Sequence, residues 1–135
     1  MIAISITNLM KTALALSALE TAVDAGSEVL TIDSTDAVEH IGRNLLATIP
    51  LELAGYITAV NLDGDILSID FIESLNLSEG MATTLRIAIE QAVTAEIMHI
   101  ATGNDAYAER SRRLFAGVKH TLKGRLPVGT RRWYF

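Results

Sequence analysis

The sequence predicts an α+β fold, in which about four helices pack with a β-hairpin and an extended arm follows the last helix. Apolar residues recur at helical spacing in four segments, and an Asp63-Gly64 turn separates two runs rich in Ile, Val, Thr and Tyr. At 135 residues the chain is long enough for one core. We therefore expect a single domain over residues 1–124 and an arm over residues 125–135. The predicted helices span residues 5–25, 36–48, 79–102 and 105–123, and the hairpin spans residues 55–72.

The first two helices are predicted from their apolar faces and from the residues that flank them. Gly26 follows the first helix, where a left-handed C-cap is typical. Residues 28–33 resemble a short strand, which would extend the sheet. Residues 33–36 then offer several N-cap side chains for the second helix. Pro50 predicts that this helix ends near residue 48, because proline disfavours the helical conformation of the residue before it.

The hairpin is predicted from its turn, since Asp-Gly favours a two-residue type I′ loop. With Asp63 and Gly64 as the loop, Leu62 pairs with Asp65 and Val60 pairs with Leu67. The opposite face of the hairpin is mixed, which predicts partial cover by another element or subunit. The face that packs on the helices consists of Tyr56, Val60, Leu62, Leu67, Ile69 and Phe71.

The last two helices are predicted to form an antiparallel pair, because Gly103 and Asn104 leave only a short connection between them. Ser78 is the expected N-cap of the first, and Gly124 ends the second. Pro127 and Gly129 favour an extended arm. The last helix is amphipathic: Tyr107, Leu114, Phe115, Val118 and Leu122 share one side, and Arg112, Lys119 and Lys123 form a line on the other.

Charge is distributed unevenly along the chain. Residues 1–104 hold 14 acidic and 3 basic side chains, whereas residues 105–135 hold 8 basic and 2 acidic ones, so a segment of net charge −11 precedes one of +6. The basic segment of such a chain can bind the acidic segment of a copy of itself, head to tail, or another anionic surface.

Half of the residues are apolar. This content indicates either apolar surface that a neighbouring molecule covers or an Ala- and Leu-rich helical core.

The basic last helix and the aromatic arm form the densest group of candidate functional residues. One interpretation is that they bind nucleic acid, with cations on phosphates and a tryptophan or tyrosine stacked on a base. A second places them on the acidic body of an adjacent subunit, with the aromatic residues as buried anchors. A third is a solvated helix face and a tail folded on its own core. The acidic sequence pI of about 5.1 favours the second. These candidate contacts are Arg112, Lys119, Lys123, Arg125, Arg131, Arg132, Trp133, Tyr134 and Phe135.

Signals for catalysis or metal binding are weak. Glu96 and His99 form one Glu-x-x-His on a helix, but a carboxylate-bridged di-iron bundle needs two such motifs. We therefore keep them as weak metal candidates and expect no metal or cofactor. The Asn61–Asp65 segment has its glycine at the wrong position for an EF-hand. The chain has no cysteine, nucleophile elbow or phosphate loop.

The sequence thus predicts a non-catalytic, self-assembling structural subunit of a ring or shell, with copies of itself and other assembly proteins as partners. In organisation only, the layout resembles the head–tail connector and neck proteins of tailed bacteriophages. That resemblance implies a virion protein whose hairpin and arm contact neighbouring subunits, and whose basic helix faces DNA or an acidic partner. The alternatives are a nucleic-acid-binding module and a small metalloenzyme around Glu96 and His99.

The apolar run after Lys11 is not preceded by the basic segment of a signal peptide, and Glu20 soon interrupts it. No cleaved signal peptide or membrane span is therefore expected. The expected location is the cytoplasm or an assembled particle.

Overall fold

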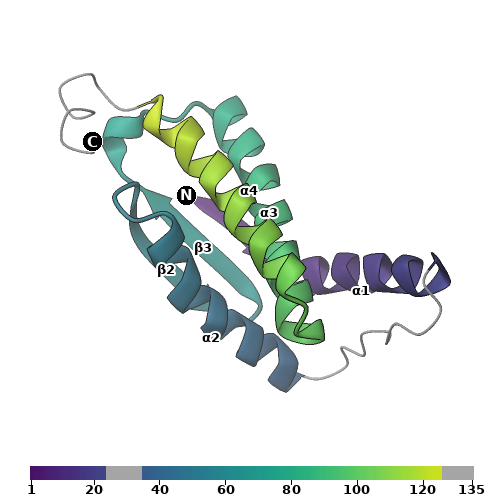
Figure 1. Cartoon of the computed structure of the whole chain (residues 1–135). Coiled ribbons are helices and arrows are strands. Elements are labelled where there is room, and N and C mark those ends of the chain that lie inside the picture. Colours follow the sequence, from purple (N-terminus) through teal and green to yellow (C-terminus); the bar gives the residue numbers. More distant parts are fainter. Residues whose placement is uncertain (24–34, 126–135) are drawn as a thin grey trace.

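The computed structural model describes residues 1–23 and 35–125 and confirms the α+β fold (Figure 1). Over these residues it has four helices, a three-stranded antiparallel sheet and one 3-10 turn. The predicted strand at residues 28–33 and the arm after Arg125 lie outside the described residues. In chain order the elements are β1 (Ile2–Ser5), α1 (Ile6–Val23), α2 (Thr35–Glu52), β2 (Ile57–Asp63), β3 (Ile66–Phe71), η1 (Glu73–Leu75), α3 (Glu79–Thr102) and α4 (Asp105–Lys123).

The sheet has the strand order β1-β3-β2, so the predicted hairpin gains a third strand from the start of the chain. The sequence pattern does not predict β1 as a strand. β1 pairs with β3 through Ile2 opposite Ile69 and Ile4 opposite Leu67. All four of these side chains are buried, because alternate residues of a strand point to the same face. β1 therefore completes the apolar face of the sheet.

The tip of the hairpin is joined to the junction between β1 and α1. The backbone N–H of Ile6 donates to the carbonyl oxygen of Asp65 at 2.8 Å, and the Ser5 hydroxyl donates to the Asp65 carboxylate at 3.2 Å. Ser5 Oγ also accepts from the backbone N–H of Asn8 at 3.3 Å. Ser5 thus satisfies an N–H at the start of α1 and helps to hold the turn of the hairpin.

The hairpin forms where it was expected, but the predicted register is wrong by two residues. Asp63 pairs with Ile66 and Leu62 pairs with Leu67, so the loop consists of Gly64 and Asp65. Only Gly64 has a positive φ in this loop, at 63°, as a type II′ turn requires at its first central position. The contacts of Asp65 with β1 and α1 are non-local, so the dipeptide alone does not reveal them. Because the shift is an even number, Leu62, Leu67 and Ile69 keep a common face.

α2 continues past Pro50, and the prediction that it ends near residue 48 is wrong. The backbone N–H of Leu53 still donates to the carbonyl oxygen of Ile49 at 2.9 Å. Pro50 therefore removes a hydrogen bond only near the end of the helix. Ile49 and Leu53, one turn apart, are both fully buried. Burial of these two side chains stabilises the helical turn that contains the proline.

α3 and α4 begin and end at the predicted residues, because polar side chains and glycine mark each boundary. Ser78 Oγ accepts from the backbone N–H of Met81 at 3.2 Å, which caps the start of α3. Gly103 ends α3 with a φ of 69°. Asn104 Oδ1 accepts from the backbone N–H of Ala106 at 3.0 Å and begins α4. The short connection makes the two helices antiparallel neighbours, as expected.

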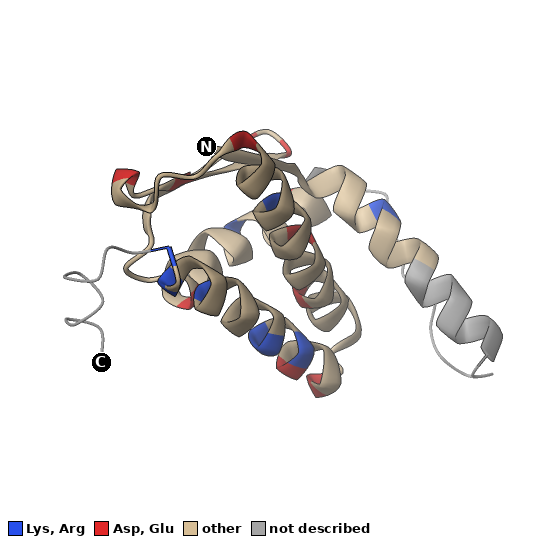
Figure 2. Ribbon diagram, turned by 90° about the horizontal axis from the view of Figure 1, so that it is seen from above, with Lys and Arg blue, Asp and Glu red and all other residues tan. Residues whose placement is uncertain are grey.

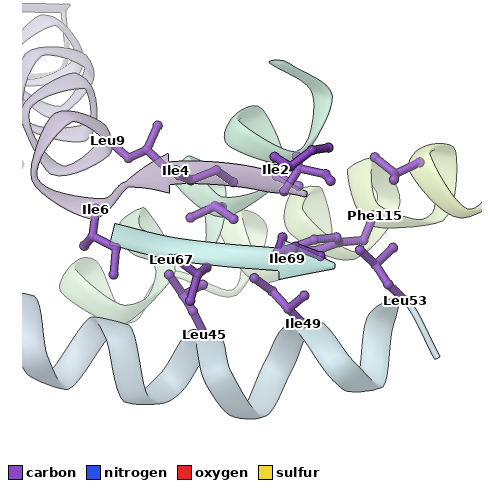
Figure 3. Close-up of a cluster of buried hydrophobic side chains, with 14 of the residues drawn as sticks. Ile2, Ile4, Ile6, Leu9, Leu45, Ile49, Leu53, Leu67, Ile69 and Phe115 are labelled. Atoms are coloured by element: carbon purple, nitrogen blue, oxygen red, sulfur yellow. The ribbon is translucent and has the colours of Figure 1, made fainter. Parts of the chain in front are cut away.

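The core lies between the apolar face of the sheet and the helices (Figure 3). Leu45, Ile49 and Leu53 of α2 point toward the strands, and Phe115 of α4 reaches the same cluster. α2 approaches β2 closely at Gly42, where an added Cβ would lie 2.6 Å from Leu62 Cδ2. α4 packs mainly on α3 and leaves one long side outside the core.

Candidate functional site

The outer side of α4 is the main concentration of positive charge in the described residues (Figure 2). α4 carries five Lys or Arg and two acidic side chains. Its inner side is buried through Phe115, Val118 and Leu122. Ser111 is also buried, and its hydroxyl donates to the carbonyl oxygen of Ala92 in α3 at 3.1 Å. These contacts fix the rotation of α4 and thereby direct its charged residues outward.

Four basic side chains of α4 are exposed and form no ion pair with another described residue: Arg110, Arg112, Arg113 and Lys119. The ion pairs of the described residues lie within α2, between Arg43 and Glu39, and within α3, between Arg86 and Glu90. The positive charge of α4 is therefore not neutralised by close contacts inside the described part of the chain. It is open to an anionic partner.

Lys119 and Lys123 lie on a flank of α4 rather than pointing straight away from the core. With His120 and Ala116 they face Tyr56 across a shallow hollow of about 340 Å³. Tyr56 is buried, in the segment that joins α2 to β2. Cations in the last turn of a helix also interact favourably with its dipole, and this accounts for part of the cluster. The hollow thus extends the basic surface from α4 toward the sheet.

Arg125 has a contact within its own chain. Its guanidinium donates to the carbonyl oxygen of Asn76 at 3.0 Å, and Asn76 follows η1 in a left-handed conformation with a φ of 47°. Arg125 therefore connects the end of α4 to the segment before α3. The predicted contacts from Arg131 to Phe135 lie outside the described residues.

The outer face of the sheet has the opposite charge to α4. Asp63 and Asp70 are the charged residues of the three strands, and the strands contain no Lys or Arg. The register places both on the face that points away from the core, where Ser68, Asn61 and Ile66 are their neighbours. In Figure 2 the sheet lies on one side of the molecule and α4 on the other. One side is therefore acidic and the opposite side is basic.

A groove of about 450 Å³ lies where α1 passes α3 and α4. Leu9, Met98 and Leu114 supply apolar surface, one from each helix. Glu90, Gln91 and Arg110 line it with polar groups. Ile87, also part of the lining, is 50% exposed and adds apolar surface to the groove. The lining of the groove thus combines apolar side chains, the aromatic ring of Tyr107, and one acidic and one basic side chain.

Glu96 and His99 show no arrangement for a metal ion. Glu96 is half-buried and forms no ion pair with another described residue, and His99 Nδ1 lies 3.1 Å from the carbonyl oxygen of Asn104. Among residues 1–23 and 35–125, no three side chains of His, Asp or Glu come together as a metal site. His99 instead contacts the start of α4, at the connection between the two helices.

Comparison of the chain with models of protein families, with curated proteins and with solved structures finds no match. Among the described helices, none combines the length and the apolar character that crossing a membrane requires.

The structure brings some predicted site residues together and separates others. Lys119 and Lys123 share one hollow, whereas Arg112 lies farther along α4 and Arg125 turns to Asn76. Asp63 and Asp70 both belong to the predicted hairpin, but the sequence pattern does not show that β1 joins it to form one outer face without basic residues. The groove had no sequence signal, since α1 lies far in the chain from α3 and α4, which supply the rest of its lining.

Proposed function

We propose that this protein is a non-catalytic subunit that assembles with copies of itself, head to tail, into a ring or shell. The observation that carries the proposal is the separation of charge in Figure 2: exposed cations without ion-pair partners among the described residues on α4, and a sheet face bearing only acidic charges opposite. Each copy thus carries both halves of a complementary contact.

Head-to-tail contact follows from where the two surfaces lie. In a two-fold dimer both copies use the same surface, so two surfaces on opposite sides of the molecule cannot both lie in the interface, and either one alone would face like charges. A contact between α4 of one copy and the sheet of the next avoids this repulsion. Repeated contacts of that kind close into a ring when the rotation allows it, and otherwise continue as a filament. The resemblance in layout to phage connector and neck proteins supports a virion ring as the setting.

The arm would supply the binding affinity that the charged surfaces alone do not provide. Exposed ion pairs contribute little affinity, whereas buried aromatic side chains are frequent anchors of interfaces. Residues 133–135 are Trp, Tyr and Phe and provide three of the seven aromatic residues. We assign to the charged surfaces the role of fixing the register of the contact, and to the arm most of its affinity.

The mass in solution of the full chain and of a chain ending at Thr130 tests this assignment: the truncated chain should no longer assemble but should remain folded. Unfolding on truncation would instead assign the arm to its own core.

A charge-swap experiment tests the head-to-tail contact directly. Lys119→Glu combined with Arg112→Glu makes the surface of α4 acidic, and Asp63→Lys combined with Asp70→Lys makes the sheet face basic. Each double variant alone should be monomeric by light scattering, because like charges then meet at every contact. An equimolar mixture should assemble, since alternating copies restore opposite charges at both contacts. Arg43→Glu, on an exposed side chain of α2, is the matched control and should assemble as the parent does.

A mixture that stays monomeric, from double variants that are folded and from a parent that assembles, would refute contact between these two surfaces. A parent chain that is monomeric at every salt concentration would refute self-assembly itself.

The same exposed cations support nucleic-acid binding as the second candidate function. Arg110, Arg112, Arg113 and Lys119 form no ion pair with a described residue, so phosphates could approach them. The net charge of −5 opposes such binding at long range. Titration with single- and double-stranded DNA and with RNA, repeated at increasing salt, separates the two functions. Tight binding that weakens steeply with salt favours nucleic acid, and its absence at low salt excludes it.

A further inference from the structure

We infer that the groove between α1, α3 and α4 receives the aromatic arm, residues 126–135, of a neighbouring copy. The inference rests on the proposed self-assembly and adds a receptor for the arm. It starts from the groove itself, which has a volume of about 450 Å³ and is lined by apolar side chains of three helices, with Ile87 keeping half of its surface accessible. Such a site has the size of those that bury an aromatic group.

The lining matches aromatic side chains in chemistry as well as in size. Leu9, Leu114 and Met98 offer apolar contact, and a thioether interacts favourably with aromatic ring edges. Tyr107 can pair with another ring in an edge-to-face arrangement. Arg110 forms no ion pair with another described residue, so its guanidinium is available to stack on a tryptophan or tyrosine.

The charges at the groove constrain how the arm would enter. Arg131 and Arg132 directly precede the aromatic residues, and Arg110 would repel them. Glu90 and Gln91 line the same groove from α3, and the partner of Glu90, Arg86, is 3.8 Å away in a half-exposed pair. The two arginines of the arm would therefore lie toward α3, with the aromatic side chains toward α1 and Tyr107.

The position of the groove favours the arm of a second copy over the arm of the same chain. Arg110 precedes Arg125 by 15 positions on α4 and its end, a distance of about 22 Å at 1.5 Å per helical residue. From Arg125 to Trp133 there are eight residues, which span at most about 29 Å when fully extended. The arm could bring Trp133 to Arg110 of its own chain only when largely extended and directed back along α4. The arm of another copy has no such constraint.

The single tryptophan makes docking measurable in the full chain. Trp133 should show blue-shifted emission and protection from acrylamide in the assembled state. Ile87→Glu places a charge in the groove, so it should shift the emission to longer wavelength and lower the mass in solution. Leu51→Glu is the matched control, because Leu51 is 78% exposed on α2 and takes no part in the groove lining. Equal effects of the two variants would overturn the inference.

The absence of cysteine allows a test of which copy supplies the arm. Chains with Gln91→Cys are mixed with chains with Tyr134→Cys, oxidised and mapped by mass spectrometry. A disulfide between residues 91 and 134 of different chains supports the inference, and Leu51→Cys in place of Gln91→Cys should give none. A monomeric intrachain link in the double variant would overturn docking between copies.

The same data separate this inference from the proposed function. Assembly without a 91–134 link, and without a change in Trp133 emission in Ile87→Glu, would refute the groove and leave self-assembly intact. A monomer without either signal would refute both.

Discussion

Arg125 donates a hydrogen bond to the carbonyl oxygen of Asn76 across 3.0 Å, and thereby joins two segments 49 residues apart in the chain. Asn76 adopts a left-handed conformation after η1, and its own backbone N–H donates to the carbonyl oxygen of Glu73 at 2.9 Å. The end of α4 and the approach to α3 are thus held by a side chain that also begins the arm. A displacement of the arm would therefore act directly on this hydrogen bond.

Arg125→Ala should lower the free energy of unfolding by about 1 kcal/mol, since the hydrogen bond is lost but Asn76 remains accessible to water. Urea denaturation below the concentration of assembly measures the effect. Arg113→Ala is the control, because Arg113 is exposed and forms no ion pair with a described residue; it should change stability by less than about 0.5 kcal/mol. Equal losses in the two variants would show that the contact with Asn76 does not stabilise the fold.

Ile4→Ala tests the strand that the sequence pattern does not predict. Ile4 is 1% exposed and lies opposite Leu67 in the sheet, so truncation should cost about 3 kcal/mol through lost burial and an internal cavity. Ala3→Ser, on the neighbouring exposed residue, should be close to neutral. If both variants unfolded at the parent's urea midpoint, β1 would not be part of the folded domain in solution.

Two helical glycines should respond differently to the same substitution. Gly117 is exposed on α4, and no atom lies within 4 Å of an added Cβ, so Gly117→Ala should raise stability by about 1 kcal/mol through helix propensity. At Gly42 the added Cβ would meet Leu62 Cδ2 at 2.6 Å, and displacement of that side chain should cancel the gain.

Thermal unfolding of Gly117→Ala, Gly42→Ala, Leu62→Ala and the Gly42→Ala/Leu62→Ala double variant checks this expectation. In the double variant the steric conflict disappears, so the two changes should be non-additive by at least about 0.5 kcal/mol. Strict additivity would contradict the close approach of α2 and β2.

The features that the sequence predicts correctly depend on contacts between residues close together in the chain. The bounds of α3 and α4 followed from Ser78, Gly103 and Asn104, whose capping contacts involve residues only a few positions away. The end of α2 could not be predicted in this way, because burial of Ile49 and Leu53 against distant strands outweighs the effect of Pro50. The hairpin register depended on contacts of Asp65 with Ser5 and Ile6, some 60 positions earlier.

The same distinction between local and long-range features applies to the candidate site. A line of cations on α4 was visible as a helical pattern, since all of its members belong to one element. The outer face of the sheet includes β1 and the groove beside Ile87 includes α1, and each of these elements lies far in the chain from the rest of its surface. Only the tertiary arrangement shows that the two charged surfaces lie on opposite sides.

The pairing of β1 with β3 has a consequence for synthesis. Residues 2–5 leave the ribosome before their partners, residues 66–69, so about 60 further residues must emerge before the strand can pair. Until then Ile2 and Ile4 have no sheet to join, and contacts of such long sequence separation form slowly. β1 is therefore translated before the rest of the sheet but can join it only after β3 has emerged, and a chaperone that shields short apolar segments would act here before any other part of the sheet exists.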